Sequence, residues 1–389
     1  MARRTKAQKI LLLSVAMEMT EEQINCVRKI SAGFSDWQEL LSLAEQHRLL
    51  PLLVKNMQDH CYKHIPPEIL NKWKRICKDN SIKNLMMTGH LLRTLALLKA
   101  DDIPAIPFKG PVLATTLYKD PGLRVFSDID LLIHKKNLPK TVELLKRQGF
   151  VALFDLNEKQ LTKLALTDNE FPLAHRENNI TLDLQWEISG GYFPRSITID
   201  DLSLKDIFIN RVKISSFANE DLLFYLCIHG NQHTWNRLDH ICSLAELMRL
   251  RDLNWHKIFT TAKKYKAVRI LTLGLLLAEE FFNISPPAPY ASLVKKELRT
   301  TTLAEQLANK LLKEENDPPP PVNHRFMKYH FLSMDSPFLA LRYALRLFFL
   351  PTRFDWQLYP LPARLSFCHY IIRPFRLLGA TLKNLTAPD

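Results

Sequence analysis

Two aspartates, Asp128 and Asp130, interrupt an otherwise apolar run between Arg124 and Ile133. Residues two apart in a strand point to the same face, so the two carboxylates would lie side by side while Ile129 points away. Carboxylates held that close repel each other unless a cation lies between them. Magnesium prefers oxygen ligands and commonly takes one or two carboxylates together with substrate phosphates. The pair therefore predicts a site for Mg²⁺, with Mn²⁺ as the alternative ion.

A third carboxylate, Asp183, lies in a segment of strict alternation. Over 180–188 one face would carry Ile180, Leu182, Leu184, Trp186 and Ile188, and the other Thr181, Asp183, Gln185 and Glu187. With 171–176 this segment predicts a hairpin around 177–179. Metal-assisted displacement at phosphorus also needs a carboxylate that completes the site or orients the acceptor hydroxyl. We assign this role to Asp183; a solvated acid on an exposed sheet face is the alternative.

Two basic positions before the aspartates are candidates for binding phosphate. Lys109 and Gly110 follow a short β-like segment, 103–108, and precede a helical stretch that reaches about Tyr118. Backbone amides and the positive end of a helix can hold a phosphate at such a junction, and glycine permits close approach. Arg124 would bind a phosphate or pair with an acid. A helix-start glycine beside an incidental lysine is the alternative for the first position.

Three further polar residues, His229, His233 and Arg237, are spaced by four. This spacing predicts that they share one face of a single helix, with His240 a further turn on. They would contact a triphosphate or the leaving pyrophosphate. Zinc binding is less favoured because there is no H-E-x-x-H pattern and no evident third ligand. Histidines hydrogen-bonded at a domain interface are the alternative.

These motifs follow one another in a recognisable order. They are Lys109-Gly110-Pro111, Tyr118 to Arg124, Ser127 to Ile133, Leu182 to Trp186, His229 to Leu238, Asp355-Trp356 with Leu361-Pro362, and Arg373 to Leu377. From about residue 30 to 380 the chain resembles a bacterial family of uncharacterised nucleotidyltransferases, related to the polymerase-β-like superfamily. The resemblance implies a mixed-sheet nucleotidyltransferase fold with Asp128 and Asp130 as metal ligands, Asp183 as the third carboxylate, and Ser127 beside the nucleotide.

The sequence departs from the family pattern at three places. Lys109-Gly110 stands in place of the superfamily's Gly-Ser phosphate turn, 18 residues before Asp128. Gln185 stands where the family usually has histidine, and Ser243 where it often has aspartate. The core carboxylates are intact.

The elements that must position these residues form an α/β (α+β) arrangement with helices on both sides along the chain. Apolar residues recur at helical spacing over 37–57, 69–100, 219–250 and 255–282. A strand is expected over 124–133, and a helix capped by Asn137 that ends near Gly149. We divide the chain into a helical region, 1–100, a catalytic core, 101–215, a helical domain, 216–316, and a proline-rich linker (317–321) with a basic helical region to 389.

Composition is that of an ordinary globular protein of 389 residues, with 47% hydrophobic and 24% charged residues. The six cysteines show no paired spacing, which favours a reducing compartment. No signal peptide or transmembrane segment is expected, so we predict a cytoplasmic protein.

The net charge of +13 lies in the flanks. Residues 1–100 carry 16 basic and 9 acidic side chains, 101–324 carry 28 of each, and 325–389 carry 9 and 3. Basic flanks indicate an acidic partner such as RNA, a nucleotide-bearing substrate or an anionic membrane surface; solvated lysines are the alternative. A C-terminal cluster mixes aromatic and basic residues, as nucleic-acid-binding or membrane-surface segments do: Arg364, His369, Tyr370, Arg373 and Arg376. Packing of this cluster back on the sheet is the alternative.

The predicted reaction is transfer of a nucleoside monophosphate from an NTP to an unidentified hydroxyl-type acceptor, which is a protein side chain, a small metabolite or an RNA end. Three alternatives stay open: a toxin-like transferase acting on tRNA, a catalytically silent nucleotide-binding or interaction protein, and a peripheral membrane factor using the C-terminal segment.

Overall fold

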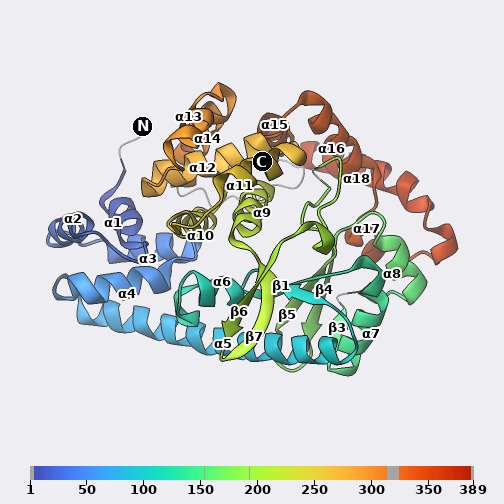
Figure 1. Ribbon diagram of the computed structural model, residues 1–389, viewed down its shortest axis with the longest axis horizontal. Helices are drawn as coiled ribbons and strands as arrows, with labels where there is room; N and C mark the ends of the chain where they lie inside the picture. Colours follow the sequence, from blue (N-terminus) through green and yellow to red (C-terminus); the bar gives the residue numbers. More distant parts are fainter. Residues whose placement is uncertain (1–3, 153, 192, 313–323, 387–389) are drawn as a thin grey trace. The chain divides into compact units, whose positions relative to one another are not determined.

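The chain folds into an α+β structure of many helices and a mixed β-sheet (Figure 1). The computed structural model describes residues 4–152, 154–191, 193–312 and 324–386; the predicted linker 317–321 lies outside them. Two compact units share the described residues. Unit 1 takes them from 1–91, 109–127 and 203–335, and unit 2 from 92–108, 128–202 and 336–389. The division into four consecutive segments stays a prediction.

Unit 2 contains the mixed sheet. Its strands are β1 (Ala105–Pro107), β2 (Asp128–Ile133), β3 (Phe150–Ala152), β4 (Glu170–His175) and β5 (Thr181–Gln185), in the order β1-β2-β5-β4-β3. Strands β2 and β5 pair in parallel, and every other neighbouring pair is antiparallel. The hairpin predicted from alternation is confirmed as β4 and β5, and all five apolar residues of the alternating segment are buried.

The strand that carries Asp128 and Asp130 is shorter than predicted, because β2 begins at Asp128 and not at Arg124. The preceding residues form the 3-10 turn η2 (Pro121–Leu123), and the Arg124 carbonyl accepts from Asn84 Nδ2 at 2.7 Å. This hydrogen bond ties residues 121–124 to helix α5 (Pro67–Ala100), at the part of α5 that belongs to unit 1, instead of to a neighbouring strand. Helix α7 (Leu138–Arg147) forms as predicted, but the side chain of Asn137 makes no capping hydrogen bond. The short helix α8 (Glu158–Leu164) follows β3 in the chain.

Unit 1 is mainly helical. Before the sheet segment it has α1 (Lys6–Ser14), α2 (Glu21–Ser31), α3 (Trp37–Gln46), α4 (Leu50–Cys61) and the start of α5, and then α6 (Pro111–Thr116). After it come the hairpin β6 (Leu204–Ile209) and β7 (Val212–Phe217), α9 (Asn219–Gln232), α10 (Leu238–Met248), α11 (Trp255–Lys264), α12 (Val268–Phe282), α13 (Ala288–Lys295), α14 (Leu298–Leu311) and α15 (His324–Ser333). The predicted helical stretches are confirmed, but left-handed residues such as Arg48, Trp235 and Lys266 divide three of them into pairs of helices.

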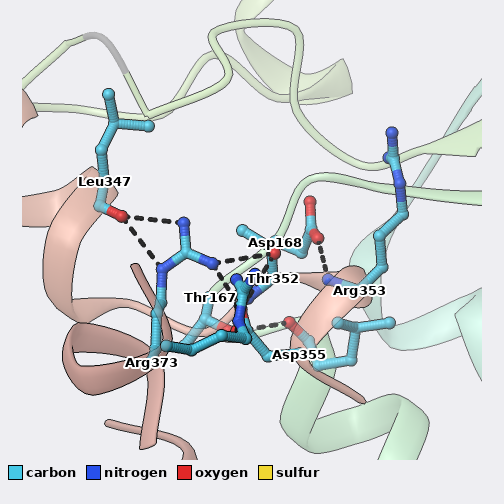
Figure 2. Close-up of polar contacts among 9 residues, drawn as sticks. Thr167, Asp168, Leu347, Thr352, Arg353, Asp355 and Arg373 are labelled. Carbon is cyan, nitrogen blue, oxygen red and sulfur yellow. Dashed lines mark hydrogen bonds and ion pairs between the residues drawn. The ribbon is translucent and has the colours of Figure 1, made fainter. Parts of the chain in front are cut away.

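The C-terminal segment of unit 2 is organised around one buried carboxylate, Asp355. It comprises α16 (Pro337–Phe349), α17 (Arg353–Leu358) and α18 (Cys368–Thr386). Asp355 accepts from the backbone N–H of Thr352 at 2.8 Å and pairs with Arg373 (Figure 2). It also pairs with Arg376, at 2.8 Å. Burial raises the pKa of Asp355. The Thr352 amide and the two guanidinium groups lower this pKa by more than burial raises it, so the net shift is downward.

Replacing Asp355 with Asn should therefore destabilise the protein. Two arginines would lose their buried counter-charge, which costs about 3 kcal/mol of unfolding free energy. Since the folded-state pKa lies below its ordinary value, the contribution of the native carboxylate is complete above the ordinary carboxyl range and lost as pH falls through the lowered pKa. Denaturant unfolding between neutral and acidic pH would measure both effects. The matched control is Asp206→Asn, which breaks the exposed pair with Lys213 and should change stability little.

Candidate active site

The three predicted carboxylates lie on one face of the sheet in unit 2. In the parallel ladder Asp130 is directly opposite Asp183, and Asp128 is opposite Thr181. Residues opposite each other share a face, as do residues two apart, so all three side chains project to the same side. Asp130 is only 2% exposed, whereas Asp128 and Asp183 are partly exposed. Two of the three acids therefore remain accessible from solvent.

A neighbouring amide holds the buried acid in place. Gln185 Nε2 donates to Asp130 Oδ1 at 3.1 Å, and Gln185 is itself buried. The residue that departs from the expected histidine thus has a defined position, since it fixes one oxygen of Asp130. A neutral donor next to a buried carboxylate favours its charged form.

The same face contains a fourth acid, Glu170, which sequence reasoning missed. Glu170 is opposite Gln185 in the β4–β5 ladder and pairs with the guanidinium of Arg353 from α17. The backbone N–H of Arg353 also donates to Asp168 Oδ2 at 2.6 Å (Figure 2). Glu170 lies in the predicted hairpin region, but its partner lies 183 residues further along the chain, and no local pattern links the two.

The charges of this face act on Arg353. Burial lowers its pKa, but Glu170 and Asp168 raise it, and the net shift is upward. Asp183 raises it as well, so the guanidinium lies within the electrostatic reach of the third candidate carboxylate. Arg353 therefore offsets part of the negative charge on this face.

The carboxylate face fits a magnesium ion that takes part of its ligands from substrate. Its donors are carboxylate oxygens, the type that Mg²⁺ prefers. Among the described residues no three His, Cys, Asp or Glu side chains are grouped as a complete metal site. Mg²⁺ usually takes one or two carboxylates and fills its remaining positions with phosphate oxygens and water, which the Asp128 and Asp130 pair would allow.

The candidate phosphate-binding histidines do not share one helix, and that prediction is wrong. Helix α9 ends at Gln232, Thr234 and Trp235 are left-handed, and α10 begins at Leu238. The Trp235 amide donates to the Gly230 carbonyl at 2.8 Å, and a β-carbon on Gly230 would come within 2.4 Å of the Trp235 ring. The tight packing of this tryptophan on glycine reverses the chain.

The turn nevertheless gathers the three histidine rings. Their centroids are 4.6 Å apart for His229 and His233, 5.1 Å for His229 and His240, and 5.4 Å for His233 and His240. Arg237 adjoins them, with Nη2 2.7 Å from His240 Nε2 and Nε donating to Asp239 Oδ1 at 2.9 Å. The residues predicted as a set are therefore brought together by a helix–turn–helix in unit 1.

Burial keeps His229 and His240 neutral at neutral pH. Burial, followed by the charge of Lys109, holds the pKa of His229 well below its usual value. Burial lowers the pKa of His240 to about 3, although Asp239 opposes the shift. The positive charge that an anion would meet in unit 1 therefore comes from lysine and arginine.

Lys109 and Gly110 lie at the predicted junction, but the helix there is short. Gly110, with φ of 45°, precedes the six-residue α6, whose first residue, Pro111, has no N–H. The next amide, of Val112, donates to the Lys109 carbonyl at 2.9 Å. Lys109 Nζ lies 5.9 Å from the centre of the Tyr225 ring. A phosphate would consequently gain more from the charge of Lys109 than from the amides of this turn.

Arg124 is a more specific candidate than Lys109 for binding an anion. Its Nε and Nη1 atoms are buried, and neither has a hydrogen-bond partner among the described residues. Burial raises the pKa of Asp239, but His240, Arg237 and Arg124 together outweigh burial, and the net shift is downward. Buried guanidinium donors without hydrogen bonds are costly, and phosphate oxygens match their geometry. Ser127, directly before β2, is exposed.

Residues 34–283 match the uncharacterised nucleotidyltransferase family, and this stretch is more than half of the chain. The chain belongs to this family. Membership in a nucleotidyltransferase family supports nucleotidyl transfer as the general reaction and implies an NTP substrate. A solved structure, an antigenic nucleotidyltransferase-like protein from Paracoccidioides brasiliensis, is 15% identical, with a TM-score of 0.32 over 58% of this chain and 93% of that chain. No curated protein matches the sequence.

The buried histidines should make this nucleotidyltransferase sensitive to acid. Because the folded-state pKa of His240 is lowered, the unfolded chain binds a proton first, and stability falls as pH drops below the ordinary histidine value towards about 3. His240→Gln should reduce the pH slope of the unfolding free energy by about 1.4 kcal/mol per unit between about pH 6 and 4. Denaturant titrations at several pH values would measure this slope. The exposed His64→Gln is the control, and an unchanged slope in both variants would contradict a buried neutral His240.

Proposed function

We propose that the protein transfers a nucleoside monophosphate from an NTP to a hydroxyl-type acceptor and releases pyrophosphate. The observation that carries the proposal is the β2–β5 register, which places Asp130 opposite Asp183 with Asp128 on the same face. In a chain of the nucleotidyltransferase family, this arrangement provides the acids that phosphoryl transfer requires. We propose no identity for the acceptor beyond its hydroxyl-type chemistry.

In this proposal Asp128 and Asp130 hold Mg²⁺ or Mn²⁺, with Gln185 fixing Asp130. A bound divalent ion would neutralise charge on the phosphate oxygens during displacement. The acceptor oxygen forms a bond to the α-phosphorus, and the bond from that phosphorus to the bridging oxygen of the β-phosphate breaks. The electron pair leaves with pyrophosphate. Asp183 accepts the hydroxyl proton.

For unit 1 by itself we propose a phosphate-binding set of cationic and neutral donors. Arg124 would satisfy its buried Nε and Nη1 on phosphate oxygens. Lys109 and Arg237 add positive charge. His229, which burial keeps neutral, and His233 would act as hydrogen-bonding groups. Asp239, bonded to Arg237, limits the cost of bringing several cations together.

Incubation of the protein with each α-phosphate-labelled NTP, a cell extract and Mg²⁺ or Mn²⁺ would test the reaction. The native protein should label a discrete product, and Asp128→Asn/Asp130→Asn should reduce the rate about 10³-fold, since charge neutralisation by the metal is worth several kcal/mol. The matched control is Asp206→Asn, an exposed strand aspartate that should keep full activity. Sensitivity of the product to nuclease or protease would identify the acceptor class. Absence of label with all four NTPs, from folded protein, would favour the silent nucleotide-binding alternative.

Arg124→Lys should weaken NTP binding more than it slows turnover. Lysine keeps the charge but loses the paired donor geometry, and a hydrogen bond to a charged group is worth about 1.5–3 kcal/mol, so KM should rise about tenfold or more. Steady-state kinetics would separate KM from kcat. The exposed Arg251→Lys provides the comparison. Equal KM values for the two variants would remove Arg124 from the phosphate-binding set.

A further inference from the structure

The C-terminal segment exposes an unusual amount of apolar surface. Of the 25 large hydrophobic side chains exposed among the described residues, 13 lie between 338 and 378, about a tenth of the chain. Seven of these 13 are phenylalanine or tyrosine. Single exposed hydrophobic residues are ordinary, but a concentrated set indicates a binding surface.

On α16 these side chains form one stripe. Phe338, Leu341, Leu345 and Phe349 follow three- and four-residue spacing, so they share a helix face. The opposite face is buried at Leu339, Ala340 and Tyr343. On the flank of the stripe, Arg342 donates to the Phe193 carbonyl at 2.7 Å and Arg346 to the Thr167 carbonyl at 3.3 Å. These bonds hold the inner side of α16 within unit 2 and leave the apolar stripe outward.

Helix α18 repeats the pattern and packs beside α16 (Figure 1). Ile371, Phe375 and Leu378 are exposed on one face, while Arg373 on the other donates to the Leu347 carbonyl at 3.0 and 2.8 Å (Figure 2). The face that carries the arginine network therefore points inward on α18, and its apolar side is exposed. The two stripes are attached to the same ionic framework at Asp355.

The charge of this segment has one sign. Residues 336–386 contain seven basic side chains and a single acid, Asp355, which is fully buried. The described surface of the segment therefore presents no carboxylate. Arg364, next to the apolar residues Leu365 and Phe367, is exposed.

We propose that this face of α16 and α18 binds the surface of an anionic lipid bilayer. Aromatic and aliphatic side chains over one helix face with arginine at its edge are suited to the boundary between headgroups and acyl chains. An acid-free surface complements anionic headgroups, whereas a symmetric contact between two copies would oppose basic groups to basic groups. No helix among the described residues is long and apolar enough to cross a membrane, so the binding proposed is peripheral.

Sedimentation of the full chain with vesicles tests the proposal. The protein should pellet with vesicles of phosphatidylcholine mixed with phosphatidylglycerol, less with phosphatidylcholine alone, and less as salt is raised. Phe338→Ser/Phe375→Ser, at side chains 72% and 71% exposed, should weaken binding about tenfold or more without lowering the melting temperature. The matched control is Phe208→Ser, a phenylalanine 63% exposed in β6, which should bind as the native protein does.

Arg364→Gln should reduce binding to the anionic vesicles and leave the weak binding to neutral vesicles unchanged. Three results would overturn the proposal: no pelleting with either vesicle, equal binding by the double variant and the Phe208→Ser control, or self-association in light scattering that the double variant abolishes while vesicle binding is absent. The last would assign the face to a second copy of the chain.

Discussion

The parallel pairing of β2 with β5 is the constraint on which the candidate carboxylate site depends. A parallel ladder fixes which residues share a face, and here it sets Asp130 against Asp183. Because β5 is the central strand of the sheet and β2 lies next to it, with β1 pairing on the outer side of β2 and β4 on the other side of β5, neither can shift register alone. A slip of one residue would turn every side chain to the other face, burying acids among Leu182 and Leu184. The apolar side of the sheet thus holds the acids in position.

The C-terminal segment contributes to the same unit through charge. Asp355 pairs with two arginines and, by accepting from Thr352, caps the start of α17. Arg353, the first residue of that helix, pairs with Glu170 on the carboxylate face. The family match ends at residue 283, so these contacts come from a part of the chain beyond it. Two of the three arginines in the C-terminal cluster predicted from the sequence, Arg373 and Arg376, are engaged in ion pairs and carbonyl contacts within unit 2.

Local patterns in the sequence were sufficient for the strand and hairpin elements and for most helices. Alternation identified β5 because one of its faces is buried, and spacing placed Asp128 and Asp130 on one side of β2. The same reasoning failed at Trp235, where a buried ring packing on Gly230 overrides a helical period that continues through the sequence. It also extended β2 back to Arg124. The Arg124 carbonyl accepts from Asn80 and Asn84 of α5, which lie 44 and 40 positions earlier in the chain, so no local pattern reveals them. Long-range partners such as Arg353 and Glu170 have no local signal at all.

The balance of charge on the carboxylate face explains how four acids can share it in a folded chain. Carboxylates gathered on a sheet repel one another, and each would favour its protonated form if nothing opposed this. Gln185 donates to Asp130, and Arg353 pairs with Glu170 while remaining within reach of the charge of Asp183. The protein's own groups therefore offset part of the repulsion, through the amide of Gln185 at Asp130 and the guanidinium of Arg353 at the β4 side of the face. A divalent cation would offset more of this repulsion, and Asp128 and Asp130, two residues apart on one face of β2, are the acids spaced to hold one.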